Sequence, residues 1–308
     1  MAKKQTVNVY AYKISTPAID TARNVATDGY YNHQLFEGFL NEIISNSRNK
    51  ILESGKYIHL IGIKQSSDAD VLEGLFHTTR YGTKSDIIDV SNDKVVSQLE
   101  PMHGVKNIVN FVIHRKSGIL LIQNDPFKLI QRNNLIDFLE RNVELGKKHV
   151  TKFNIDFKPL LVSNSNFYTI QTIYDEDFYQ QLAKIANIKA VSINTKVQKE
   201  SVNTALSKFT HSGVSSDDYL DDVTDVTYTF KNSRRNNGVK HVKNFIKNAL
   251  DLEKIDTIIA HGSNKEKVEF NKIKPRKYQI TTTINDSKVL DQSKIIEGMI
   301  KIVKEFKE

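Results

Sequence analysis

The chain has 308 residues, a formal net charge of +8, 39% hydrophobic residues and no cysteine. The lack of cysteine excludes disulfides and thiolate metal sites, and no segment approaches the roughly 18 uninterrupted apolar residues of a membrane-spanning helix. The N-terminal sequence lacks the apolar run of a signal peptide. We therefore expect a soluble, cytoplasmic protein that does not insert directly into a membrane.

The first half of the chain predicts mostly strands. Apolar patterns typical of strands occur at residues 7–14, 56–65, 72–81, 108–113 and 119–122. The last two form a predicted hairpin around Lys116, Ser117 and Gly118. Because both runs are almost continuously apolar, we expect this hairpin at the centre of a sheet.

Two helices and a long loop complete this half. A broad apolar face predicts a helix at 33–53. Asp125 and Pro126 predict the start of a second helix that runs to about residue 141, since Asp is a favoured N-cap and Pro suits the first helical position. The mostly polar residues 86–103 are predicted to form a loop.

The second half alternates strands with helices. Strands are predicted at 150–162, 167–174, 188–197, 225–231, 255–261, 267–273 and 278–284. Helices are predicted at 175–186, from Val239 onward and from Gln292 to the end. Hairpins interspersed with helices indicate an α+β fold with mixed or antiparallel sheets. The length favours two domains, expected at 1–148 and 149–308.

The net charge is concentrated in the last quarter of the chain. Residues 1–230 carry 26 Lys and Arg against 26 Asp and Glu, whereas residues 231–308 carry 18 against 10. The stretch 231–247 holds six basic residues and no acidic one. A local excess of this kind indicates a polyanionic partner.

Local patterns place these cations on a loop and on one side of a helix. A polar run at 232–238 predicts a turn that carries Arg234 and Arg235, whose guanidinium groups can fork onto a phosphate. The predicted helix from Val239 carries Lys240, Lys243 and Lys247 on a stripe beside its apolar arc, about one per turn of 5.4 Å. The alternative interpretation is a solvated helix face.

A second basic group lies at residues 265–277, interrupted by Glu266 and Glu269. No helix-turn-helix, zinc-finger or paired-aromatic RNA motif accompanies either group, so we expect binding through the nucleic-acid backbone, independent of sequence. The candidate DNA-binding residues are Lys231, Arg234, Arg235, Lys240, Lys243, Lys247, Lys272, Lys274, Arg276 and Lys277.

Motifs of common enzyme classes are missing, namely GxxxxGK[ST], GxGxxG, GxSxG and HExxH. The acidic run 217–225 contains Asp217, Asp218, Asp221, Asp222 and Asp225. It allows three interpretations: a divalent-metal site of a nuclease, a solvated loop, or a loop that folds onto the basic segment and competes with nucleic acid. His59 and His77 lie on predicted strands and are interpreted as structural residues. We expect no cofactor and no catalytic residues.

The order of elements from the hairpin FVIHRKSGILLIQ through the strand VTYTFK, the basic loop and helix, the strand YQITTTI and the closing helix resembles the RexA-type phage-exclusion proteins. The resemblance covers roughly residues 105–308. It implies a dimeric, two-domain protein that binds double-stranded DNA without sequence specificity in antiphage defence. It carries over no catalytic residues.

We therefore expect a sequence-independent double-stranded DNA-binding protein that acts in phage exclusion as a homodimer, with a membrane effector protein as a further candidate partner. Two alternatives stay open. One is a metal-dependent nuclease that uses the acidic run 217–225. The other is a protein-interaction module whose basic face meets an acidic protein.

Overall fold

The computed structural model has an α+β fold in which antiparallel sheets are combined with helices, which confirms the predicted class. It describes residues 3–27, 29–46, 50–52, 55–173, 184–185, 187–196, 225–232, 257–263, 266–271 and 275–306. The chain divides into two compact units: residues 1–173 with 276–308 form the first, and residues 174–275 form the second. Within the described ranges, no helix has both the length and the apolar character needed to span a bilayer.

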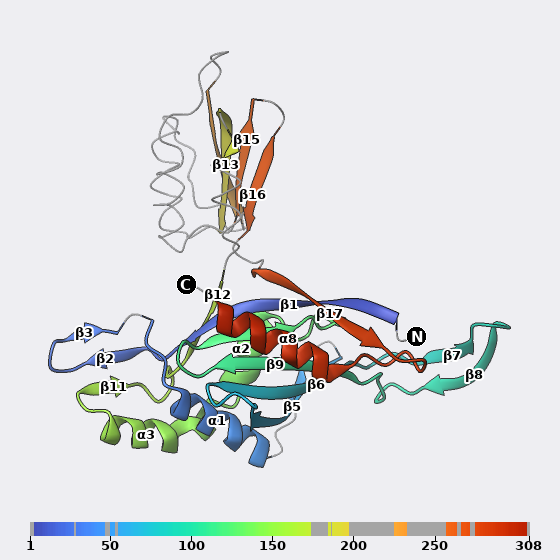
Figure 1. Ribbon diagram of the computed structural model, residues 1–308, viewed down its shortest axis with the longest axis horizontal. Coiled ribbons are helices and arrows are strands. Elements are labelled where there is room, and N and C mark those ends of the chain that lie inside the picture. The colour runs from blue at the N-terminus through green and yellow to red at the C-terminus, as the bar shows by residue number, and fades with distance from the viewer. Residues whose placement is uncertain are drawn as a thin grey trace, which may run out of the picture. The chain divides into compact units, whose positions relative to one another are not determined.

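The first unit is built on one large antiparallel sheet (Figure 1). Its strands follow the order β12 (Thr169–Thr172), β1 (Lys3–Ser15), β10 (Ile119–Gln123), β9 (Asn107–His114), β6 (Val71–Arg80), β5 (Lys56–Gln65) and β4 (Lys50–Leu52). The β9–β10 hairpin lies inside this order, which confirms its predicted central place. Its turn contains Gly118 at φ 72°, in the backbone region that favours glycine.

Strand β1 is shared between distant parts of the chain. Its residues 3–10 pair with β17 (Lys277–Ile284) and its residues 12–15 pair with β12. Because β10 occupies the other side of β1, β17 and β12 lie end to end along one edge. The Arg276 N–H donates to the Ile173 carbonyl at 2.7 Å, and the Ala11 N–H donates to the Arg276 carbonyl at 3.0 Å. Residues 174–275 are thus inserted between β12 and β17, and the residues that flank the insertion, Ile173 and Arg276, are hydrogen-bonded to each other.

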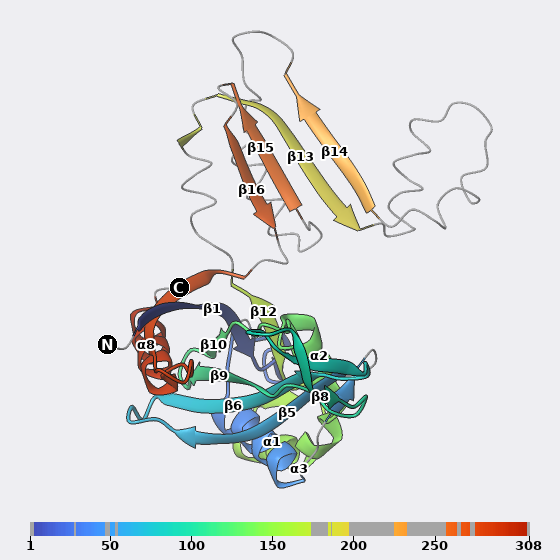
Figure 2. The ribbon, with the colours of Figure 1, turned by 90° about the vertical axis from the view of Figure 1, so that its right-hand side faces the viewer.

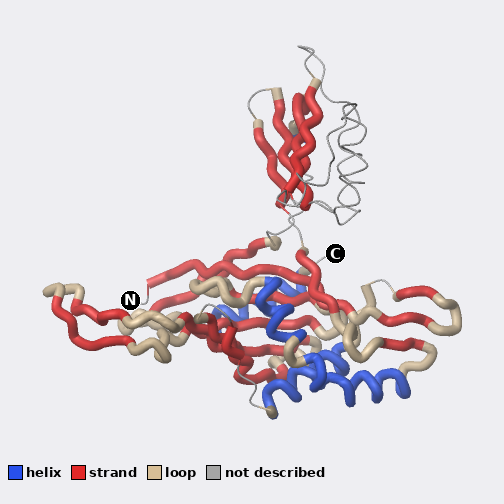
Figure 3. Tube along the Cα trace, turned by 180° about the vertical axis from the view of Figure 1, so that it is seen from behind, coloured by secondary structure: helices blue, strands red, loops and turns tan. Residues whose placement is uncertain are grey.

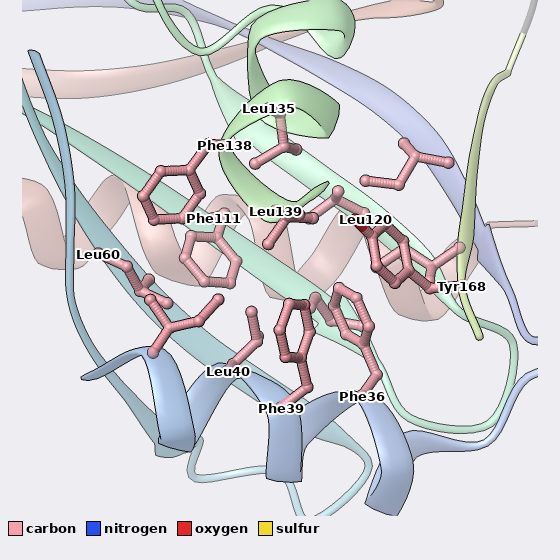
Figure 4. Packing of buried hydrophobic residues seen from close by; sticks show 14 of the residues in the cluster. Phe36, Phe39, Leu40, Leu60, Phe111, Leu120, Leu135, Phe138, Leu139 and Tyr168 are labelled. Carbon is pink, nitrogen blue, oxygen red and sulfur yellow. The ribbon is translucent and has the colours of Figure 1, made fainter. Parts of the chain in front are cut away.

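One face of this sheet holds the main hydrophobic core (Figure 4). Helix α1 (His33–Ser45) buries a helical arc of side chains, namely Leu35, Phe36, Phe39, Leu40 and Ile43. The Asn32 side chain caps this helix by accepting from the Leu35 N–H at 2.9 Å. Phe39 packs edge-on against Phe167, with 5.0 Å between ring centroids. The helix was predicted to continue to residue 53, but it ends at Ser45, and β4 occupies residues 50–52.

The other face is covered by α8 (Gln292–Glu305), which packs against β9, β10 and β17. Its buried side chains Ile295, Met299 and Val303 recur at helical spacing and meet apolar residues of the sheet. The Asp291 side chain caps the helix by accepting from the Lys294 N–H at 3.3 Å. This helix was predicted from the same apolar face and is confirmed.

Asp125 does not begin a helix, contrary to the prediction. Its carboxylate accepts from the backbone N–H groups of Phe127, Leu129 and Ile130 in a compact turn. Helix α2 (Arg132–Glu140) starts only after this turn. The Asp125 carboxylate accepts backbone N–H groups as an N-cap does, but the turn that it closes is not the first turn of a helix.

The predicted strand at 150–162 is also wrong for most of its length. Residues 147–156 form helix α3 (Lys147–Asp156), and only β11 (Leu160–Val162) is extended. Val150 and Phe153 lie three residues apart and are buried in the main core, so tertiary packing selects the helix over the β-branched local sequence. The expected domain boundary after residue 148 falls inside this helix, and β17 and α8 return to the first unit, so the chain divides differently from 1–148 and 149–308.

Residues 86–103, predicted as a loop, contain a two-stranded hairpin of β7 (Ser85–Asp89) and β8 (Lys94–Leu99). The hairpin projects from the rest of the first unit at the left-hand end of Figure 3. A separate small sheet is formed by β11, β2 (Ala18–Asp20) and β3 (Val25–Ala26). A short 3-10 helix, η1 (Val143–Gly146), precedes α3.

The second unit contains a four-stranded antiparallel sheet in the order β14 (Asp225–Lys231), β13 (Ile188–Lys196), β15 (Thr257–Gly262) and β16 (Lys267–Asn271). The strand β14 has the predicted bounds. The helices predicted at 175–186 and from Val239 onward lie outside the described residues, apart from residues 184–185.

Candidate nucleic-acid interface

The two faces of the second unit's sheet differ in polarity. Side chains alternate between faces along a strand, and residues directly opposite each other share a face. The apolar face carries the buried residues Val191, Ile193, Ile258, Ala260 and Val268. The opposite face, here called the polar face, carries Lys231, Thr229, Thr227, Ala190, Ser192, Asn194, His261, Ile259, Thr257, Lys267 and Glu269.

A basic row crosses the polar face at one end. Lys231 of β14 lies opposite Ala190 of β13, Ala190 lies opposite His261 of β15, and His261 lies opposite Lys267 of β16 (Figure 2 shows the four strands side by side). Lys231, His261 and Lys267 are exposed. With strands about 4.8 Å apart, the two lysines are anchored about 14 Å from each other.

Hydroxyl and amide groups follow the basic row along the face. Ser192 and Thr229 hydroxyls are 3.1 Å apart, and the Asn194 side-chain amide donates to the Thr227 hydroxyl at 3.3 Å. Such groups commonly donate hydrogen bonds to phosphate oxygens. The polar face therefore offers both charge and neutral donors to a phosphate backbone.

One carboxylate lies beside the basic row. Glu269 accepts from the Lys267 ammonium group at 3.1 Å, and both side chains are more than a third exposed. An exposed pair of this kind contributes less than about 1 kcal/mol. A phosphate can therefore compete with Glu269 for Lys267 at little cost.

The tyrosine and phenylalanine side chains described on this sheet do not lie on the polar face. Tyr228 and Phe230 of β14 lie opposite Ile193 and Val191, and so belong to the apolar face. Among the side chains described on the polar face, the ring of His261 is the only aromatic one. The described part of the face thus has no stacking platform of the kind by which sheets bind single-stranded bases.

The ten predicted DNA-binding residues are divided by the structure. Arg234, Arg235, Lys240, Lys243, Lys247, Lys272 and Lys274 lie outside the described residues. Lys231 ends β14 on the polar face. Arg276 and Lys277 belong to the first unit, where the Arg276 guanidinium lies 5.2 Å from the ring centroid of Tyr278 and 5.5 Å from that of Phe306. Arg276 therefore already stacks on aromatic rings of its own unit.

The excess charge is also divided between the units. Residues 231–275 of the second unit carry 11 basic and 5 acidic residues, but residues 174–230 carry 5 and 9. The second unit as a whole has a net charge of +2, and the first has +6. The positive charge of the second unit is thus a feature of its later half, which contains β15, β16 and the end of β14.

No metal centre supports the nuclease alternative in the part of the chain that the structure describes, where no three His, Asp or Glu side chains cluster. Asp217, Asp218, Asp221 and Asp222 lie outside that part, and Asp225 is the first residue of β14. His59 and His77 lie directly opposite each other on β5 and β6, half-buried on the sheet.

This histidine pair predicts how the stability of the first unit depends on pH. Burial lowers the pKa of His59, and burial together with Lys106 and His59 lowers the pKa of His77 below the usual 6.5. Below about pH 6.5 the unfolded chain therefore binds more protons than the folded chain, so the stability should fall as the pH drops through the folded-state values. Urea unfolding at pH 7.5, 6.0 and 5.0 should show this loss, and His59→Gln with His77→Gln should reduce it.

The value at pH 7.5, where the imidazoles are neutral in both states, serves as the baseline for each protein. Burial also lowers the pKa of His114, so the double variant should still lose some stability as the pH falls. Parallel pH profiles for the parent and the double variant would contradict the prediction.

His261 and Lys267 were not among the predicted contact residues. Lys267 lies within the second basic group, but its place in a row with Lys231 depends on three strand pairings. The hairpin of β15 and β16 could have been predicted from its two strand patterns, which would place residues 261 and 267 opposite each other. The pairing of β13 with β15, which are separated by about 60 residues, has no local signal.

Comparison with known proteins adds no relative. No protein-family model matches the chain, and no curated protein matches it.

Proposed function

We propose that this protein binds double-stranded DNA independently of sequence, through the polar face of the second unit's sheet. The observation that carries the proposal is the exposed row of Lys231, His261 and Lys267 across three of its four strands. Its span of about 14 Å corresponds to the axial rise of about four nucleotides of one B-DNA strand.

The neighbouring sequence supports a larger contact surface. Lys231 is the last residue of β14, and the basic stretch with Arg234 and Arg235 follows it directly in the chain. This stretch therefore starts from the end of β14 that holds the basic row. In the proposal, Lys240, Lys243, Lys247, Lys272 and Lys274 extend the row with further phosphate contacts.

The chemistry of the polar face favours duplex over single-stranded nucleic acid. Single-strand binding without sequence preference generally uses aromatic rings that stack on bases. The described polar face offers ammonium groups, hydroxyls and amides, which suit phosphates and carry no direct base readout. In the proposal this binding serves phage exclusion, the role implied by the resemblance to RexA-type proteins.

The test is the salt dependence of duplex binding. Lys231→Glu with Lys267→Glu should weaken binding of a random-sequence duplex by roughly tenfold or more at low salt and reduce the slope of log K against log salt by about 1.8, because two phosphate contacts are lost. Fluorescence anisotropy from 50 to 300 mM salt measures both quantities. Duplexes of different sequence should give the same values.

A charge-matched control is available in the first unit. Lys152 on α3 and Lys301 on α8 are exposed, so Lys152→Glu with Lys301→Glu makes the same change in net charge in the first unit, outside the polar face. This control should lose much less affinity. Equal losses in the two double variants would refute the proposed surface, and a flat response of the parent at low salt would favour an acidic protein as the partner instead.

A further inference from the structure

The hairpin formed by β7 and β8, here called the arm (residues 85–99), pairs with no third strand among the described residues. It extends away from the main sheet at the right-hand end of Figure 1. An isolated two-stranded hairpin is at best marginally stable in water, and three or more strands with an apolar face are needed for independent stability. Within the described ranges, no further strand or helix layer covers the arm to stabilise it.

Apolar side chains of the described chain are unusually exposed on and beside the arm. Seven of the fourteen exposed large apolar residues lie between residues 87 and 105, namely Ile87, Ile88, Val90, Val95, Val96, Met102 and Val105. Ile88 lies directly opposite Val95 across the hairpin. A concentration of this kind indicates an interaction surface.

The two edges of the arm differ in how strongly they oppose pairing with a further strand. Strand β7 carries Asp86 and Asp89, and charges along an edge oppose pairing with another strand. Strand β8 carries Lys94 at its start and then Val95–Leu99 without any charge. Its outer edge is therefore the one suited to accept a further strand.

The charge of the arm indicates which kind of partner it binds. Residues 85–100 contain one lysine and four acidic residues, Asp86, Asp89, Asp93 and Glu100. A polyanion such as DNA, or an anionic lipid surface, would be repelled. A partner that complements this edge is an apolar, uncharged strand flanked by one charge of each sign, and residues 94–100, which are β8 and the glutamate that follows it, have this composition. Glu100 also lies 3.6 Å from the Lys84 ammonium group of its own chain, and this exposed pair is weak enough for another cation to compete with it.

We propose that the β8 edge pairs with β8 of a second copy of this chain, antiparallel and about a two-fold axis at Ser97. In this register Lys94 lies opposite Glu100 of the second copy, and Val95 lies opposite Leu99 of the second copy. The two arms form one four-stranded sheet with two interchain ion pairs. Because the two-fold axis uses the same edge of both copies, the contact produces a dimer and leaves no β8 edge for a third copy. Shifting the register by one residue in either direction removes both ion pairs.

Pairing through β8 also separates the acidic strands. The two β7 strands become the outer edges of the four-stranded sheet, about three strand spacings or 14 Å apart. This exceeds the Debye length of about 8 Å at physiological salt, so their repulsion is screened. Pairing through β7 would instead bring Asp86 and Asp89 of the two copies together. The inference does not depend on DNA binding by the second unit.

The first test exchanges the two charges. The parent chain should sediment with twice the 35.2 kDa mass of the chain. Lys94→Glu and Glu100→Lys should each weaken dimerisation by at least about tenfold, because each places like charges opposite each other at both ends of the contact. The combined variant should restore the dimer, whereas Lys152→Glu should leave it unchanged.

The second test uses the absence of cysteine from the chain. Ser97→Cys should form an interchain disulfide readily under mild oxidation, because directly opposite residues have Cα atoms about 4.5–5.5 Å apart, within the range that disulfides span. Ser85→Cys, on β7 of the same hairpin, should remain mostly unlinked. A monomeric parent, a dimer indifferent to both single charge changes, or equal cross-linking of the two cysteine variants would overturn the proposed pairing.

Discussion

A chain in which residues 174–275 are replaced by a glycine–serine linker of about five residues should fold into a stable first unit and lose at least about 100-fold in DNA affinity. The reason for folding is that Ile173 and Arg276 are already joined by a 2.7 Å backbone hydrogen bond and both bond to Ala11. The reason for lost affinity is that the proposed contact surface lies wholly within the removed residues. Thermal unfolding and anisotropy measure the two effects.

The matched control is a chain that stops after residue 173. It lacks β17 and α8 as well as the second unit, so Val7, Val9 and Val112 lose the partners Ile280, Ile295 and Met299. This truncation should fail to unfold cooperatively. If the linker chain behaves in the same way, residues 174–275 are essential to the first unit. If the linker chain folds but keeps its DNA affinity, binding belongs to the first unit and its net charge of +6.

Replacing Asp125 by Ala should destabilise the first unit by about 3 kcal/mol and lower its melting temperature by about 10 °C. Asp125 is only 4% exposed, and its carboxylate accepts five hydrogen bonds. The donors are the N–H groups of Phe127, Leu129 and Ile130, the Thr78 hydroxyl and the Asn107 amide. Truncation leaves buried donors unpaired, which costs more than the loss of the bonds alone.

Urea unfolding compares this variant with Asp156→Ala, which removes an exposed carboxylate from the last turn of α3. That control should change stability by less than about 0.5 kcal/mol. Asp125→Asn should be intermediate, because its amide keeps one acceptor oxygen while its NH2 group faces N–H donors. Equal stability of the Asp125→Ala variant and the control would show that the turn finds other acceptors.

Elements with a complete local signal were predicted almost to the residue. The sequence DVTYTFK gives β14, and the apolar runs on either side of Lys116–Gly118 give the β9–β10 hairpin. The arm was missed because SDIID and KVVSQL are each short and partly polar, and an exposed hairpin has no buried face to impose alternation. Helix α3 was missed because burial of Val150 and Phe153, and not local propensity, selects its conformation.

In the candidate site, too, the features with a local sequence signal were predicted and those set by tertiary pairing were not. Lys231 was predicted as a contact residue because it belongs to the basic stretch 231–247. The basic row required the register of β14, β13, β15 and β16, which depends on pairings between segments far apart in the sequence. A charge count over sequence could identify the segment that carries the excess but not the sheet face on which individual cations meet.

The shared edge of β1 has a consequence for biosynthesis. Residues 3–10 leave the ribosome long before their partners in β17, which are made about 270 residues later. At roughly 5–20 residues per second, this strand waits some 15–50 s for its neighbour. During that time the apolar Val7 and Val9 and one row of backbone N–H and C=O groups stay open on the nascent polypeptide. Folding of the first unit therefore waits for β17 and α8, and holdase chaperones should associate with nascent chains that lack residues 277–305 far more than with chains that contain them.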